Sequence, residues 1–260
     1  MTAAWADAGL VTALDASTVA TVLARVRAGR QRVHCLTNTV AQNVTANMLL
    51  AFGATPSMAS HPEEVAAVAG GAGAILINLG TLSPEGERAI PLLADVARER
   101  GRPVVLDPVF VELSPLRMRL AQEVLRLPGV VVRGNATEMQ ALAGLIDRAP
   151  SAVRATTGAV DHIDGPSGRL AIRHGHPLMS QVTGLGCAAS ALVAACLAVE
   201  PDPVVAAGAA LAAYGIAGER AAERCRGPGS FAVELIDAIS TMDEAALKAG
   251  MARGSGGRVS

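Results

Sequence analysis

Aromatic side chains are scarce in this chain, and their scarcity limits how its interior can be built. Only 2% of the 260 residues are Phe, Trp or Tyr, although 51% are hydrophobic. The interior must therefore be filled by Ala, Val, Leu and Ile, which suit close packing of helices on a sheet. A chain of this length can bury a substantial core, as one large domain or as two small ones.

The chain also lacks a surplus of charge of either sign. Its 22 basic residues stand against 23 acidic ones, so nothing in the charge favours nucleic acid as a partner. The four cysteines, Cys35, Cys187, Cys196 and Cys225, show neither a Cys-x-x-Cys pair nor zinc-like spacing. We therefore expect no disulfide framework, and a reduced cytoplasmic compartment fits best.

Long uninterrupted hydrophobic runs are missing as well. Residues 1–14 contain Asp7 but no basic segment followed by a sustained apolar one, so we expect no signal peptide. The most apolar stretch, 188–218, is divided by the Glu-Pro-Asp-Pro sequence at 200–203. Two buried helices are therefore a better interpretation than a membrane span, and we expect no membrane partner.

Strands and helices are predicted to alternate along most of the chain. Predicted strands lie at 33–36, 74–78, 103–106, 130–132, 153–157, 160–164 and 170–173. Predicted helices lie at 15–29, 40–52, from 61 onward, and at 84–100, 115–127, 136–143, 186–199, 203–224 and 230–247. The alternation is typical of a mainly parallel sheet covered by helices on both faces. Without a repeat or a linker, we expect a single α/β domain over residues 1–249 and a disordered tail over 250–260.

Polar residues follow several of the predicted strands. Asn78, Asp107, Arg133 and Thr157 each stand at a strand end, and ligands of parallel α/β sheets bind beyond the carboxyl ends of the strands. Asp107 and Glu138 are candidate Mg²⁺ ligands because a hard cation prefers carboxylates and water. Arg133 could bind phosphate through two N–H groups, although a salt bridge is the more usual role of such an arginine.

The stretch Gly184-Leu185-Gly186-Cys187 precedes an Ala-rich segment and predicts a loop that enters a helix. The start of such a helix attracts negative charge, and Cys187 is expected to ionise more easily there. A dinucleotide fingerprint over 184–189 is disfavoured because it would belong in the first βαβ unit. A cysteine hydrolase using Cys187 with His174 or His176 is a further hypothesis, but no acid partner is apparent.

A set of short motifs occurs in order along the chain, at 32–38, 43–54, 56–59, 77–82, 106–109, 133–138, 157–161, 175–179, 182–187 and 227–231. Together these motifs resemble the hydroxyethylthiazole kinases of thiamine salvage. The resemblance implies a ribokinase-like, three-layer α/β/α fold. It also implies an ATP- and Mg²⁺-dependent kinase that forms a homotrimer with active sites at subunit interfaces.

The resemblance further implies the roles of individual residues. Met58, Gly184 and Asn38 would contact the thiazole alcohol, Arg133 and Thr157 the ATP, and Asp107 and Glu138 the metal. Cys187, beside Gly186, would occupy the catalytic position where many ribokinase-like enzymes have an aspartate base. A thiol is permissible there because phosphoryl transfer is largely dissociative and does not require a strong base.

The expected reaction is transfer of the ATP γ-phosphoryl group to the hydroxyl of 4-methyl-5-(2-hydroxyethyl)thiazole. Two departures from the family pattern keep alternatives open. Phe110 and Glu112 stand where the family has glycines, and the interval between Arg133 and Thr157 is short. The alternatives are a ribokinase-like kinase of another small alcohol and a paralogue that binds the thiazole without turnover.

Overall fold

An eight-stranded sheet forms the centre of the computed structural model, which describes residues 14–254. The strands are β1 (Arg32–Leu36), β2 (Thr55–Ser57), β3 (Ala74–Asn78), β4 (Val104–Asp107), β5 (Val131–Asn135), β6 (Val153–Thr157), β7 (Asp161–Gly165) and β8 (Gly168–Ile172). Their spatial order is β2-β1-β3-β4-β5-β6-β7-β8. The pairs from β2 to β6 are parallel, and β7 and β8 add an antiparallel edge. The prediction of a mainly parallel sheet is confirmed.

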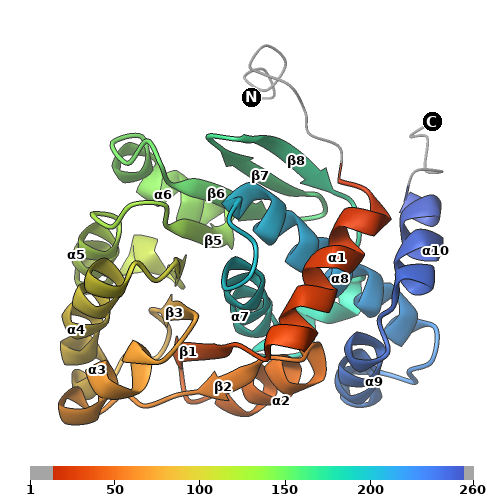
Figure 1. The fold of residues 1–260 in the computed structure, drawn as a ribbon, viewed down its shortest axis with the longest axis horizontal. Helices are drawn as coiled ribbons and strands as arrows, with labels where there is room; N and C mark the ends of the chain where they lie inside the picture. The colour runs from red at the N-terminus through yellow and green to blue at the C-terminus, as the bar shows by residue number, and fades with distance from the viewer. Residues whose placement is uncertain (1–13, 255–260) are drawn as a thin grey trace.

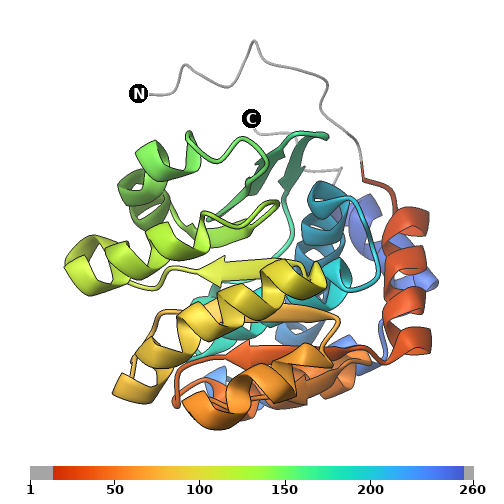
Figure 2. The ribbon, with the colours of Figure 1, turned by 60° about the vertical axis from the view of Figure 1, so that its left-hand side comes forward.

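Helices cover both faces of this sheet (Figures 1 and 2). One core contains side chains of α1 (Ala16–Gly29), α2 (Gln42–Phe52), α7 (Leu185–Leu197), α8 (Pro203–Ala222), α9 (Pro228–Ser240) and α10 (Glu244–Gly254). The other contains side chains of α3 (Pro62–Gly70), α4 (Pro84–Arg100), α5 (Pro115–Val124) and α6 (Ala136–Ile146). The predicted three-layer α/β/α arrangement is therefore present.

The apolar central strands contribute to both cores. In β3, Ala74 and Leu76 belong to the first core, whereas Ile75 and Ile77 belong to the second. Successive side chains of a strand point to opposite faces, so a strand buried on both faces has to be continuously apolar. Because these strands are parallel, the polar residues at their carboxyl ends lie at one edge of the sheet.

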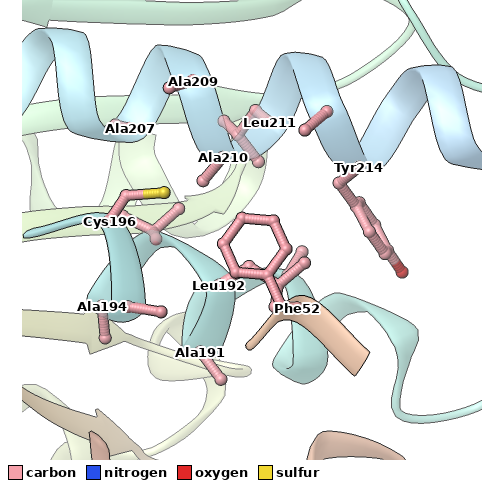
Figure 3. Packing of buried hydrophobic residues seen from close by; sticks show 14 of the residues in the cluster. Phe52, Ala191, Leu192, Ala194, Cys196, Ala207, Ala209, Ala210, Leu211 and Tyr214 are labelled. Atoms are coloured by element: carbon pink, nitrogen blue, oxygen red, sulfur yellow. The ribbon is translucent and has the colours of Figure 1, made fainter. Parts of the chain in front are cut away.

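Small residues allow the first core to be built with few aromatic rings. Phe52 gathers with Leu192 of α7 and Leu211 of α8 in a cluster otherwise rich in Ala side chains (Figure 3). At Gly215 of α8, an added Cβ would lie 2.5 Å from the backbone oxygen of His174. Glycine thus lets α8 approach the segment after β8 closely, and this segment borders the site described below.

The C-terminal part differs from the prediction. The helix expected over 230–247 is two helices, because Asp243 accepts the N–H of Ala246 at 2.8 Å and starts α10 as a new helix. The predicted tail is also wrong for residues 250–254, which belong to α10; an added Cβ at Gly250 would lie 2.6 Å from Ile216. Residues 1–13 and 255–260 lie outside the described residues. Between 14 and 254, no helix is long and apolar enough to cross a membrane.

Candidate active site

The carboxyl ends of β3 to β6 bring the predicted polar residues to one edge of the sheet. Asn78 is paired in register with Asp107, and Asn135 is paired with Thr157. The first turns of α7 face the same edge, because Ser190 of α7 contacts Asp107. Residues separated by more than 100 positions in the sequence therefore meet in one site, as the strand-end argument predicts.

Helix α7 begins at this edge without a side-chain cap. Gly184 is the N-cap with φ 82°, and among the residues that the structure describes no side chain caps the first N–H groups of the helix. An added Cβ at Gly184 would lie 2.8 Å from Cγ1 of Val44. Glycine is required here both by the left-handed backbone and by the close approach of α2. The unpaired N–H groups leave the positive end of α7 open to an anion.

Cys187 lies half-buried in the first turn of α7. The side-chain N–H groups of Asn78 and Asn38 point at its sulfur, with Nδ2 to Sγ distances of 3.2 and 3.3 Å. Burial raises the pKa of the Cys187 thiol and the charge of Asp107 raises it further, while the two asparagines lower it. The expectation of easier ionisation is therefore wrong. The helix start is favourable, but desolvation and a neighbouring carboxylate outweigh it.

Asp107 is joined to Arg133 through a residue that the sequence did not single out. Ser190, fully buried on α7, donates its hydroxyl to Oδ2 of Asp107 at 2.8 Å. Arg133 donates from Nη1 to Ser190 at 3.2 Å and to the carbonyl of Gly186 at 2.8 Å. Burial raises the pKa of Asp107, whereas Arg133 and Ser190 lower it. A basic group and a hydroxyl thus stabilise a carboxylate that burial disfavours.

Glu138 sits in the first turn of α6 with both carboxylate oxygens engaged. Oε2 accepts the N–H of Asn135 at 2.8 Å, and Oε1 accepts the N–H of Phe110 at 3.0 Å. The Asn135 side chain accepts the Glu138 N–H in return, which completes a capping box. Glu138 therefore closes the start of α6 and ties the loop after β4 to it, and its charge also raises the pKa of Asp107.

The donor set of Asp107 and Glu138 suits a magnesium ion better than a metal held by protein alone. Residues 14–254 contain no group of three or more His, Cys, Asp or Glu side chains that could hold a metal. Mg²⁺ usually binds through one or two carboxylates, water and substrate phosphates. A cation beside these two carboxylates would also favour the ionised form of Asp107, which burial opposes.

Phe110, at a position where the resemblance implies a glycine, has a left-handed backbone. Its φ is 53°, and its side chain is 56% exposed. The ring thus points toward solvent. A left-handed backbone is unfavourable for a residue other than glycine, and the hydrogen bond from the Phe110 N–H to Glu138 helps to keep the backbone in this conformation. Phe110 therefore adds an exposed aromatic ring to the loop after β4.

A cavity of about 530 Å³ lies next to the start of α7. Its wall includes Arg133, Thr157, Gly186, Tyr214 and Gly215. Nε of Arg133 is buried there without a hydrogen-bond partner in the described structure. Three of the predicted site residues, Arg133, Thr157 and Gly186, therefore share one concave surface.

Of the remaining predicted residues, His174 and His176 line this cavity, whereas Met58 does not. Met58 follows β2 and packs half-buried against the first core. His174 pairs through Nδ1 with Glu219 at 3.1 Å, and Nδ1 of His176 accepts the Leu178 N–H. The side-chain contacts of Cys187 go to asparagines and not to an imidazole, so the geometry disfavours a cysteine hydrolase.

Comparison with known proteins gives consistent matches over most of the chain. Residues 23–149 and 146–245 match the profile of the hydroxyethylthiazole kinase family. A hydroxyethylthiazole kinase from Granulibacter bethesdensis is 43% identical over 249 residues, covering 87% of this chain and 91% of the relative. A probable hydroxyethylthiazole kinase from Agrobacterium fabrum is 43% identical over 225 residues, covering 86% and 90%.

Solved structures agree with these sequence matches. The hydroxyethylthiazole kinase protein of Pyrococcus horikoshii OT3 superposes with a TM-score of 0.84 at 37% identity, covering 89% of this chain and 96% of that chain. A ribokinase-like superfamily protein from Enterococcus faecalis V583 superposes with a TM-score of 0.67 at 14% identity, covering 92% and 100%. The second likeness concerns the fold alone, which is ribokinase-like.

Proposed function

Because the chain belongs to the hydroxyethylthiazole kinase family, we propose that it transfers the γ-phosphoryl group of ATP to the hydroxyl of 4-methyl-5-(2-hydroxyethyl)thiazole. The observation that carries this proposal is the open start of α7, placed between the cavity and Asp107. Preorganised N–H groups at such a position stabilise the negative charge of a transferring phosphoryl group.

The cavity is the proposed ATP site. Arg133 and Thr157 border it near α7, and Tyr214 and Gly215 border it along α8. Nη1 of Arg133 is used within the protein, and its Nε has no partner in the described structure but is shielded from solvent, so a shift of the side chain would have to expose it before it could donate to phosphate. A guanidinium is suited to phosphate oxygens because its N–H groups form a planar fork.

The acceptor alcohol is proposed to lie on the other side of the α7 start, near Met58, Gly184 and Asn38. Cys187 would then be beside the reacting hydroxyl. Because the pKa of its thiol is raised, Cys187 is protonated at neutral pH and positions the alcohol without first removing its proton. A largely dissociative transfer allows this, since little charge has to build up on the attacking oxygen before the phosphoryl group leaves ADP.

Asp107 and Glu138 are the residues proposed to hold Mg²⁺. Bound there, the ion would bridge phosphate oxygens and neutralise developing charge. The protein's own contribution is the orientation of the carboxylates: Ser190 fixes one oxygen of Asp107, and two backbone N–H groups fix Glu138.

A homotrimer with sites between subunits is part of the same proposal. Leu50 on α2 and Val233 on α9 are 58% and 60% exposed, and these two helices lie against each other. Covering such apolar side chains would favour association. Light scattering of the purified protein tests the homotrimer by measuring the mass of the assembly in solution. A cytoplasmic location is proposed because all four cysteines are unpaired.

The test of the proposed function is product formation. Purified protein is incubated with ATP, Mg²⁺ and the thiazole alcohol, and phosphorylated thiazole is measured by mass spectrometry alongside ADP release. We expect thiazole-dependent product that falls strongly in Asp107→Ala and falls in Cys187→Ala. Product from a different alcohol in a substrate panel would reassign the acceptor. Tight thiazole binding without product from any alcohol would indicate a paralogue without turnover.

A further inference from the structure

The orientation of two side-chain amides around Cys187 is fixed by the backbone. The N–H of Ala41 donates to Oδ1 of Asn38 at 3.0 Å, and the N–H of Gly80 donates to Oδ1 of Asn78 at 3.0 Å. Each contact requires an oxygen at that position, so each NH₂ group must occupy the opposite position. The two NH₂ groups therefore face the sulfur of Cys187.

The amides also fix each other. Nδ2 of Asn38 donates to Oδ1 of Asn78 at 3.1 Å, so that oxygen accepts two N–H groups. Reversing Asn78 would set its NH₂ group against both of these donors and would leave them buried without acceptors. Asn78 itself is only 1% exposed. The polarity of the pair is thus determined, and we call Asn38 and Asn78 the amide pair.

Packing holds the amide pair in place. An added Cβ at Gly80 would lie 3.0 Å from Oδ1 of Asn78 and 3.1 Å from Nδ2 of Asn38. The pair comes from two elements, the segment after β1 and the end of β3, and both contact the first turn of α7. Two separate parts of the chain therefore converge on a sulfur atom carried by a third.

We propose that Asn78 and Asn38 are positioning residues for Cys187, and this inference rests on the proposed function of that thiol. A thiol sulfur has two lone pairs, and the amide pair directs one N–H group at each of them. The S–H group is then left to face the acceptor alcohol. The same two N–H groups stabilise the thiolate whenever the proton leaves, as donors do around a developing anion. The amide pair therefore sets both the place and the charge state of the sulfur.

Replacement of each asparagine by aspartate separates this role from a structural one. Asn78→Asp keeps an oxygen for Gly80 and for Asn38, and Asn38→Asp keeps an oxygen for Ala41, but neither presents an N–H group to the sulfur. Asn38→Ala removes the same N–H group without adding charge. Asn43→Asp on α2 is the matched control, since Asn43 is exposed and would still accept the N–H of Asn47.

The readout is the rate at which iodoacetamide alkylates Cys187 in the ligand-free protein at neutral pH. Mass spectrometry locates the adduct, and Cys187→Ala gives the background from the half-buried Cys225. We expect alkylation to slow about tenfold in Asn78→Asp and Asn38→Asp, and severalfold in Asn38→Ala, because lost donors leave less thiolate. Asn43→Asp should match the wild type. The kcat for the thiazole should also fall, because the sulfur is no longer held in place beside the acceptor alcohol, while the Kd for ATP stays within about twofold.

The opposite result would overturn the proposal. If the asparagines only hold the loops together, the variants will open the site, and Cys187 will be alkylated as fast as in the wild type or faster. Loss of the folded state in Asn78→Asp, seen by circular dichroism, leaves the two Asn38 variants to decide. A wild type that forms no thiazole phosphate would instead refute the proposed function, since the alkylation rates do not depend on turnover.

Discussion

Two helices start at the same edge of the sheet, and their first turns are built in opposite ways. Asn135 and Glu138 satisfy the N–H groups at the start of α6 and place a negative charge at its positive end. At the start of α7, Gly184 provides no side chain and Cys187 follows in the first turn. Both helices have a dipole that attracts anions. Of these two helices, α7 is the one with N–H groups left for a ligand, whereas α6 holds a carboxylate in place.

The difference shows how one edge of the sheet can bind both the metal cation and the phosphate anion of a phosphoryl transfer. The closed start of α6 supplies a fixed carboxylate suited to a cation, and the open start of α7 supplies N–H groups suited to an anion. Asp107 lies between them, bonded to Ser190 of α7 and repelled by Glu138 of α6. Substitutions that close α7 or open α6 should therefore have different effects.

The largest effect is expected from closing α7 with Gly184→Asp. The new carboxylate would accept the free N–H groups and occupy the anion site, and its Cβ would be forced to within 2.8 Å of Val44. We expect kcat/KM to fall by about 100-fold or more, the size of losing a donor to a developing anion. Gly229→Asp in the first turn of α9 is the control, because nothing lies within 4 Å of its Cβ position. A Gly184→Asp enzyme within about threefold of the wild type would contradict the role of α7.

A pH-dependent change in stability is expected from Asp107→Asn. Burial raises the pKa of Asp107, so the folded protein binds this proton more tightly than the unfolded chain does. The stabilising effect of the bound proton is complete below the unfolded pKa of about 3.9 and is lost as pH rises through the folded pKa. Asp107→Asn should therefore have the higher Tm at pH 8, with a difference that shrinks toward pH 4. A lower Tm at pH 8 would show that the hydrogen bonds of the carboxylate outweigh its burial.

Opening α6 with Asn135→Ala should cost about 1 kcal/mol of unfolding free energy, the usual effect of removing an N-cap. Because the backbone N–H groups of Thr137 and Glu138 would lose their acceptor, the turn that carries the Glu138 carboxylate would be held less firmly, and kcat should fall as well. Asp15→Ala removes the cap of α1, whose Asp15 accepts the Thr18 N–H at 2.7 Å, and should cost similar stability. Urea denaturation compares the stability of Asn135→Ala and Asp15→Ala, and steady-state kinetics compares their kcat values. Equal kcat values in the two would show that the capping box only stabilises the fold.

The smallest effect is expected from Phe110→Gly. Relief of the left-handed backbone, about 1–2 kcal/mol, is offset by the larger conformational entropy of glycine in the unfolded chain, about 0.5–1 kcal/mol. The net rise in stability should therefore lie between about 0 and 1.5 kcal/mol in urea denaturation, and below about 1 kcal/mol at the middle of both ranges. Arg30→Gly, at φ 43° in the cap of α1, is the matched control. A tenfold rise in kcat/KM for Phe110→Gly alone would mean that the exposed ring obstructs the site after all.

Much of the fold could be predicted because its elements have strong local signals. The β3 strand was predicted at its observed bounds, since a continuous apolar run between turn residues is unmistakable. The short edge strand β2 was missed, because three residues that include Pro56 give no periodic signal. The break before α10 was missed because Asp243 caps a helix within a segment whose composition favours helix throughout.

The site was predictable in position but not in all of its chemistry. Asp107 could be found because it ends β4, and Arg133 because it lies near the carboxyl end of β5, two residues before Asn135. Ser190 could not be found, because a single hydroxyl in an Ala-rich helix gives no sign that it will face a carboxylate. The direction of the Cys187 pKa was predicted wrongly because burial and the distance to Asp107 are tertiary properties.

The most direct test of the contrast between α6 and α7 is a crystal structure with MgADP, aluminium fluoride and the thiazole alcohol. Aluminium fluoride mimics the phosphoryl group during transfer. It binds where the protein stabilises the negative charge of that group. We expect the aluminium fluoride at the N–H groups of the first turn of α7 and the cation beside Asp107 and Glu138. Fluoride bound away from α7, with those N–H groups facing water, would contradict this expectation.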